Sequence, residues 1–280
     1  MKFFVLFLTV SAVTGSPLTE ESSQYRFKRR ITADLTEFPY HVQLVYKYKV
    51  PLITRCSGVI ISENLVVTTA NCVSMSPTAI ITGIQQMDEI SPFRQMGKVK
   101  KVKIHPSYSS ITGTYNIALI MLEFPLTFNS AVNKVELPPT SYKPNNTAKQ
   151  IAWARQSLSL KYTLEVTGKQ ISNCNSRMIS VNLLQLLRAL VEGDHVLCAK
   201  GESPLSECHK FSGEPLVQDK YLIGLSITGF EKCKVIASTS VYTNVAKYVG
   251  WLTSEMGSCS PNSKESTESP TGFTTASSVV

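Results

Sequence analysis

Residues 56–72 read CSGVIISENLVVTTANC, in which two short runs of apolar and β-branched residues lie between two cysteines. The runs Ser57–Ser62 and Leu65–Ala70 have the length and the Val, Ile and Thr content of β-strands. Similar runs, punctuated by Pro, Asn, Ser or Gly, recur along the chain at His41–Val45, Ile117–Leu122 and Tyr221–Ile227. Many short strands separated by turn residues predict an all-β fold, either a sandwich or a barrel.

Two stretches have helical spacing instead. Apolar residues that step by three and four predict a C-terminal amphipathic helix at Val245, Tyr248, Val249, Leu252 and Met256. A second, Leu-rich helix is predicted just before Gly193, from Leu183, Leu186, Leu187, Leu190 and Val191. We expect it to pack on the barrel, with a partner-binding surface as the alternative.

The composition is that of a globular protein. Of 280 residues, 43% are hydrophobic and 17% charged, which excludes a disordered or coiled-coil chain. The net charge is +8, and the five basic and two acidic residues of segment 1–30 account for +3 of it. No basic helix or aromatic-interleaved stripe accompanies the remaining charge, so we expect no nucleic-acid partner.

The first fifteen residues, MKFFVLFLTVSAVTG, predict a signal peptide. One Lys precedes the apolar run Phe3–Val10, and small residues precede a cleavage point at Ser16. The run is far shorter than the roughly 20 apolar residues that span a bilayer, so we expect no membrane span and a secreted, extracellular protein. In an oxidising compartment the seven cysteines are expected to form disulfides.

Residues 16–30 resemble a propeptide and residues 259–280 a flexible tail. The basic cluster Arg26–Arg30 precedes the apolar Ile31, which predicts cleavage at or next to the Arg30–Ile31 bond, with an uncut spacer as the alternative. Residues 260–280 hold ten Ser or Thr and two Pro, a composition that predicts a disordered, O-glycosylated tail. Asn145, in the sequence Asn-Asn-Thr, is a predicted N-glycan acceptor.

Six segments, taken in order, resemble the trypsin-like (chymotrypsin-fold) serine proteases over residues 31–257. The six segments are, in order, Arg30-Ile31 with Phe38–Leu44; Cys56–Ser62; Val67–Cys72; Ile104–Tyr108 with Asn116–Leu119; Cys208–Val217; and Val241–Val245 with Trp251-Leu252. The resemblance implies two six-stranded antiparallel β-barrels with a C-terminal α-helix, in one protease-like domain over residues 31–258.

The resemblance breaks at the catalytic positions. Asn71 stands where the family has its catalytic histidine, Asn116 stands at the aspartate, and only Ser212 matches the nucleophile. A serine hydroxyl needs a neighbouring base to take its proton, and an amide has no titratable group near neutral pH. The sequence therefore predicts a non-catalytic member of the family, a kind especially numerous in arthropods.

The surroundings of Ser212 are altered as well. Lys210 and Phe211 stand where the family has Gly-Asp, and Glu214 replaces a glycine, so the resemblance implies loss of the oxyanion hole and of the activation ion pair. Ser206 falls at the base of the specificity pocket and offers no carboxylate to a basic side chain.

No other group is expected to replace the missing base. His209 is the nearest histidine in sequence to Ser212, and we interpret it, like His41, His105 and His195, as an ordinary polar or partly buried residue. No histidine pair has metal-ligand spacing, so neither a metal nor another cofactor is expected.

By resemblance, the disulfides pair Cys56 with Cys72, Cys174 with Cys198, and Cys208 with Cys233; the spacing alone leaves the connectivity open. Cys259 is left over, either as a free thiol or as a link to a second chain.

These observations favour a secreted inactive homologue that binds extracellular proteins: active proteases, inhibitors or receptors. No cysteine-rich module precedes the domain, since residues 16–55 contain no Cys, which disfavours the clip-bearing immune subclass. Two alternatives remain, a weak or unconventional serine endopeptidase that uses Ser212 with His209, and a matrix or mucus component that acts through its tail and Cys259.

Overall fold

The computed structural model describes most of the expected domain, namely residues 31–47, 56–87, 89–155, 162–174, 193–201, 211–227 and 239–258. The predicted signal peptide, propeptide-like segment, Leu-rich helix and tail lie outside these residues. So do the following positions: Arg30, Ser206, Cys208, His209, Lys210, Cys233 and Cys259.

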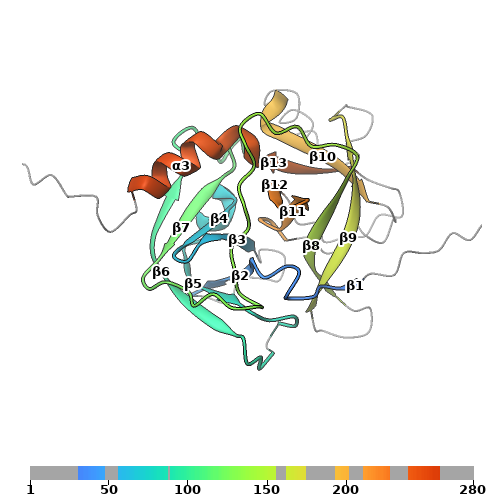
Figure 1. Cartoon of the computed structure of the whole chain (residues 1–280). Helices are drawn as coiled ribbons and strands as arrows, with labels where there is room; N and C mark the ends of the chain where they lie inside the picture. Colours follow the sequence, from blue (N-terminus) through green and yellow to red (C-terminus); the bar gives the residue numbers. More distant parts are fainter. Residues whose placement is uncertain are drawn as a thin grey trace, which may run out of the picture.

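Two closed, six-stranded antiparallel β-barrels form the molecule, as the resemblance implied, and they lie side by side (Figure 1). The first barrel has the strand order β2 (His41–Tyr46), β3 (Ser57–Ser62), β4 (Leu65–Thr68), β7 (Ala118–Leu122), β6 (Gln95–Ile104) and β5 (Pro77–Thr82). The second has the order β9 (Tyr162–Ser172), β10 (Val196–Gly201), β13 (Thr239–Asn244), β12 (Tyr221–Ser226), β11 (Pro215–Gln218) and β8 (Thr147–Arg155). Pairing of β8 with β9 closes the second barrel.

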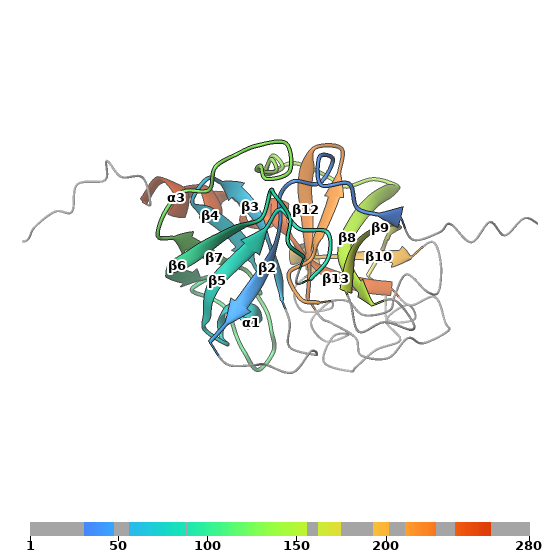
Figure 2. The same ribbon diagram turned by 90° about the horizontal axis from the view of Figure 1, so that it is seen from below.

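The apolar runs read from the sequence form the strands for a simple reason. All four residues of β4 and five of the six residues of β3 are buried, because one face of each strand lines the barrel and the other packs on the rest of the molecule. One continuous hydrophobic core contains residues of both barrels, among them Ile60 and Ile120 of the first and Trp153 and Leu222 of the second. The two barrels are therefore packed on each other, with the view from below in Figure 2 showing them as neighbours.

The predicted strand Leu65–Ala70 is two residues too long. β4 ends at Thr68, and Thr69 is the extended residue before the short helix α1 (Ala70–Val73). The chain must turn there because Cys72 is joined by a disulfide to Cys56 at the start of β3. This turn places Asn71 on α1 instead of on a strand.

The C-terminal helix is present but begins as a tighter coil. A 3-10 turn, η4 (Val245–Tyr248), precedes α3 (Val249–Ser258), and Leu252 is the fully buried residue of α3. A further single turn, η2 (Gly193–His195), directly precedes β10, whose Cys198 is joined by a disulfide to Cys174. Among the described helices, none has the length and apolar character that a membrane crossing needs.

Candidate functional site

Three residues that are far apart in the sequence meet between the barrels. Asn71 lies on α1, Asn116 precedes β7, and Ser212 lies in the loop that leads into β11 of the second barrel. Asn116 is 3% exposed and Ser212 is 8% exposed, so water has little access to either side chain. The structure thus brings together the three positions that the sequence singled out as a degenerate catalytic triad.

The three side chains form a continuous hydrogen-bonded chain. The backbone N–H of Asn71 donates to Asn116 Oδ1 at 3.0 Å, and Asn116 Nδ2 donates to Asn71 Oδ1 at 2.9 Å. Asn71 Nδ2 then donates to Ser212 Oγ at 3.2 Å. The hydroxyl of Ser212 in turn donates to the backbone carbonyl of Ile227 at 3.0 Å.

The direction of this chain is fixed by its first member. A backbone N–H can only donate, so the atom of Asn116 that faces it must be the carbonyl oxygen. The other end of that amide is then a donor, which requires the oxygen of Asn71 to face it. What remains for Ser212 is the NH₂ group of Asn71, and the serine oxygen must accept.

This polarity is the reverse of the one that activates a serine. In a Ser-His-Asp triad the hydroxyl donates to the imidazole, which donates to the carboxylate. Here hydrogens point from Asn116 to Asn71 and from Asn71 to Ser212, and the hydroxyl proton is held by the carbonyl of Ile227. The sequence gives no sign of this acceptor, since a backbone carbonyl leaves no residue-type signal.

The loop that carries Ser212 is tied to the first barrel by its backbone. The N–H of Ser57 donates to the carbonyl of Ser212 at 2.8 Å. The next residue, Gly213, has φ +80°, and a Cβ there would lie 2.1 Å from the Ser57 carbonyl oxygen. Only glycine fits this close approach, so the pattern Ser-Gly is required by the packing of the two barrels.

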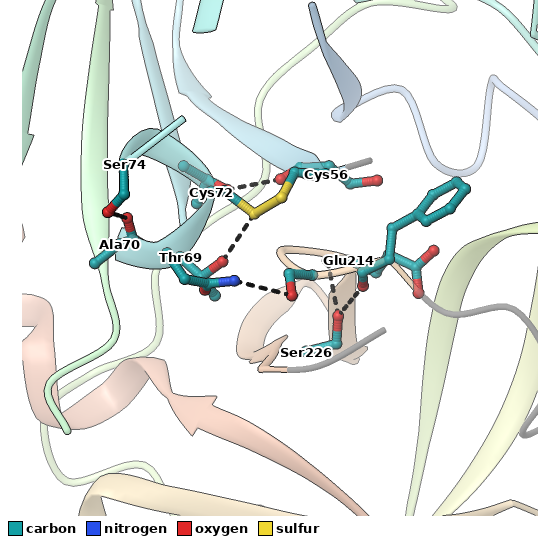
Figure 3. Close-up of a disulfide and its surroundings, with 12 residues drawn as sticks. Cys56, Thr69, Ala70, Cys72, Ser74, Glu214 and Ser226 are labelled. Atoms are coloured by element: carbon teal, nitrogen blue, oxygen red, sulfur yellow. Dashed lines mark hydrogen bonds between the residues drawn. A yellow bond between two sulfur atoms is a disulfide. The ribbon is translucent and has the colours of Figure 1, made fainter. Parts of the chain in front are cut away.

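A second set of hydrogen bonds holds the loop to its own barrel. The Ser226 hydroxyl donates to the Phe211 carbonyl at 2.6 Å and accepts from the Glu214 N–H at 3.1 Å (Figure 3). The same view shows the Cys56–Cys72 disulfide beside α1, across from the segment that holds Glu214. The Glu214 side chain is fully buried, and its two oxygens accept from the backbone N–H of Trp153 at 3.0 Å and from Gln150 Nε2 at 3.2 Å.

Phe211, which stands where the resemblance implies the aspartate of the activation ion pair, makes an apolar contact instead. Phe211 is 5% exposed, and its ring centroid lies 5.4 Å from that of Tyr162. Ile31 is 67% exposed and lies in the short strand β1 (Ile31–Thr32), which pairs with β9. Ile31 is therefore held on the outside of the second barrel.

The described histidines have aromatic neighbours, and none of them is hydrogen-bonded to Ser212. His41 is buried against Trp153, with ring centroids 5.5 Å apart, and burial lowers the pKa of His41 to about 3. His105 stacks on Tyr115 at 5.2 Å, and its pKa is lowered by partial burial and by the nearby His195. Within the described ranges, no group of three His, Cys, Asp or Glu residues has the arrangement of a metal site.

Of the remaining predicted positions, some are described by the structure and others lie outside the described residues. Asn145 is exposed in the loop before β8, and its Oδ1 accepts from Gln218 Nε2 at 3.2 Å. The disulfides Cys56–Cys72 and Cys174–Cys198 are the pairs that the resemblance implied. Ser206, Lys210, His209 and the pair Cys208 and Cys233 lie outside the described residues.

Fold and site together define a member of a known family of serine proteases. The trypsin family matches residues 30–252, and the chain belongs to that family. It is 28% identical to "Trypsin 5G1" of Aedes aegypti over 265 residues, which cover 89% of this chain and 94% of that protein. It is 27% identical to "Chymotrypsin-like elastase family member 1" of Rattus norvegicus, with 77% and 84% covered.

Solved structures agree with the fold. The structure of GrC superposes with a TM-score of 0.65 at 18% identity, covering 82% of this chain and 99% of GrC. The crystal structure of the scabies mite inactivated protease paralogue S-D1 superposes with a TM-score of 0.64 at 24% identity, covering 81% and 96%.

Proposed function

We propose that this chain is a secreted serine protease homologue that has lost catalysis and acts by binding other proteins. It serves as a cofactor, decoy or regulator of active proteases in an extracellular fluid, with those proteases, their inhibitors or receptors as partners. The observation that carries the proposal is the direction of the hydrogen bonds at Ser212, whose oxygen accepts from Asn71 and whose proton goes to Ile227.

Chemistry supports the loss of activity. Neither amide can take the serine proton at neutral pH, and neither carries charge to stabilise a protonated base. In a comparable protease, loss of the serine or of the histidine alone lowers turnover about a millionfold. A solved structure described as an inactivated protease paralogue has the same barrel architecture, so the fold persists without activity in at least one such protein.

The test uses the secreted full chain and a Ser212→Ala variant as its matched control. Both are treated with an active-site-directed fluorophosphonate and assayed on mixed peptide substrates. We expect the two proteins to give the same background labelling and hydrolysis. Labelling of Ser212 well above the control would contradict the proposal and favour the alternative, a weak endopeptidase that uses Ser212.

Binding is tested separately from inactivity. The purified chain is immobilised, exposed to the native secretion and washed, and the captured proteins are identified against a column that carries Ser212→Ala. We expect proteases, their inhibitors or receptors on both columns, because binding does not depend on the hydroxyl. Capture of none of these classes would contradict a regulatory role.

Secretion and processing are further parts of the proposal. Two disulfides, Cys56–Cys72 and Cys174–Cys198, suit an oxidising compartment, and the exposed Asn145 is open to a glycosyltransferase. N-terminal sequencing of the secreted protein is expected to give a chain that starts at Arg30 or Ile31, and a start near Ser16 would contradict cleavage.

Glycosidase treatment tests glycosylation at Asn145. It is expected to change the electrophoretic mobility of the wild type and to leave that of the Asn145→Gln variant unchanged.

A further inference from the structure

Strand β6 has an unusual distribution of lysines. Its ten residues, QMGKVKKVKI, include Lys98, Lys100, Lys101 and Lys103. Successive side chains of a regular strand point to opposite faces. In an uninterrupted strand, the two even-numbered lysines would therefore face away from the two odd-numbered ones, and one pair would enter the barrel.

A β-bulge removes this conflict. Val99 pairs with Leu122 and Lys101 pairs with Met121, so one extra residue, Lys100, is accommodated between two consecutive partners on β7. Val99 and Val102 both pack against the hydrophobic core. The lysines are left on the outer face of the barrel, with Lys98, Lys100 and Lys101 exposed and Lys103 partly exposed.

The positive charge on this face is only partly balanced. Lys98 pairs with Glu123 at 2.8 Å, and Lys103 pairs with Glu255 of α3. Lys100 and Lys101 have no ion pair with any residue that the structure describes. β6 pairs with β5 through Gln95–Lys98 and with β7 through Val99–Ile104, so the lysines lie where the strand passes from one neighbour to the other.

We propose that this basic face, defined by Lys98, Lys100, Lys101 and Lys103, binds a linear sulfated polysaccharide. The four ammonium groups follow one strand over about 16 Å, a row that matches an extended polyanion better than a single compact anion. Lysines supply separate point charges, whereas recognition of a phosphopeptide favours the bidentate fork of arginine. The outward residues of β6 include no aromatic ring on which a nucleic-acid base can stack.

The place of the face in the molecule suits a docking role. β6 lies on the side of the first barrel that faces away from the second barrel (Figure 1). A glycan bound there leaves the region between the barrels open to a protein partner. An encounter with an extracellular glycan rests on the proposed secretion, but the affinity of the basic face for the polysaccharide does not. Secretion and glycan binding can therefore be refuted independently.

The sharpest test is a gain of affinity. Glu123→Gln removes the carboxylate that neutralises Lys98, while Glu37→Gln makes the same charge change beside Lys149 of β8, in the second barrel. Titration calorimetry of the full chain with a heparin octasaccharide at fixed ionic strength is expected to show about two- to threefold tighter binding for Glu123→Gln and little change for Glu37→Gln. No binding by the wild type, or equal tightening by both variants, would overturn the proposal.

A loss-of-affinity pair completes the test. The double variant Lys100→Gln/Lys101→Gln is expected to bind the octasaccharide about tenfold more weakly. Lys149→Gln/Lys220→Gln removes the same charge from lysines that pair with Glu37 and Glu136, and we expect it to bind like the wild type. Equal weakening in both double variants would indicate general charge attraction and would refute the inference. So would displacement of the bound octasaccharide by polyglutamate or single-stranded DNA as readily as by free polysaccharide, since that would indicate another partner.

Discussion

The two barrels have the same number of strands but differ in what they bury. In the first, the buried polar groups include Thr68 and Thr82, whose hydroxyls donate to the backbone carbonyls of Ser57 and His41. In the second, Gln150, Lys169 and Glu214 are fully buried. The first barrel is therefore held mainly by apolar packing, whereas the second also depends on the exact pairing of buried charged and amide groups.

The buried polar network of the second barrel includes a position at which this sequence departs from the family's residue pattern. Glu214 stands at a position where the resemblance implies glycine, and its carboxylate now joins the Ser212 loop to β8 through Trp153 and Gln150. Gln150 also accepts from the Tyr242 hydroxyl at 2.9 Å. The loop keeps a defined place through this network and through the contact of Phe211 with Tyr162.

The largest effect is expected in the second barrel. Glu214→Leu removes the acceptor of the Trp153 backbone N–H and of the Gln150 side-chain NH₂ in a buried site, which we expect to lower the free energy of unfolding by about 3–5 kcal/mol. The control in the first barrel is Ile120→Val, whose expected cost is about 0.5–1.5 kcal/mol. Urea unfolding followed by tryptophan fluorescence measures both. Equal costs would remove the distinction drawn between the barrels.

Next come the two described disulfides, one in each barrel. The sequence separations are 16 residues for Cys56–Cys72 and 24 residues for Cys174–Cys198. Chain entropy in the unfolded state varies slowly with loop length, so replacing either pair by alanine is expected to cost about 3 kcal/mol. Thermal melts of the two double variants should therefore agree closely. A cost confined to one barrel would show that native-state packing, rather than loop closure, decides the effect.

A smaller effect concerns pH and the one buried histidine of the first barrel. Burial lowers the pKa of His41 to about 3, against about 6.5 in an unfolded chain. As pH falls below about 6.5, the unfolded state takes up a proton that the folded state does not, so stability decreases. Between pH 7 and pH 5 this contribution amounts to about 2 kcal/mol.

Other groups titrate over the same range, so the measurement is a difference. Urea unfolding of the wild type and of His41→Phe is compared at pH 7 and at pH 5. We expect the wild type to lose about 2 kcal/mol more than the variant over this interval. Identical losses would mean that His41 is protonated in the folded protein.

Much of the fold could be predicted from the sequence, because strand-length runs of Val, Ile and Thr between turn residues are local signals. The boundary of β4 was missed because a disulfide and the turn at Thr69, not propensity, end that strand. At the site, the resemblance to the trypsin-like proteases identified Asn71, Asn116 and Ser212. The acceptor role of the Ile227 carbonyl and the anchoring of Glu214 depend on three-dimensional contacts between barrel strands and a loop, which no local pattern encodes.

The smallest expected effect is that of repairing the triad. The double variant Asn71→His/Asn116→Asp places a base where Asn71 Nδ2 now lies 3.2 Å from Ser212 Oγ, and a carboxylate where Asn116 Oδ1 accepts the Asn71 N–H. The polarity of the hydrogen bonds can then reverse, so the serine can donate to the imidazole. The variant nevertheless retains Lys210 and Phe211 in place of the family's Gly-Asp, and Phe211 is packed on Tyr162.

Those two positions decide the outcome, since loss of one oxyanion donor alone lowers turnover about a hundred- to a thousandfold. We expect the double variant to hydrolyse peptide substrates no faster than a triple variant that also carries Ser212→Ala. Adding Lys210→Gly and Phe211→Asp, with the chain cut before Ile31, supplies the family's glycine at position 210 and a charge partner for the new N-terminus, and is expected to give the first measurable turnover. Turnover by the double variant well above its Ser212→Ala control would show that the loop already has a productive shape, and that the two amides at positions 71 and 116 are the whole of the defect.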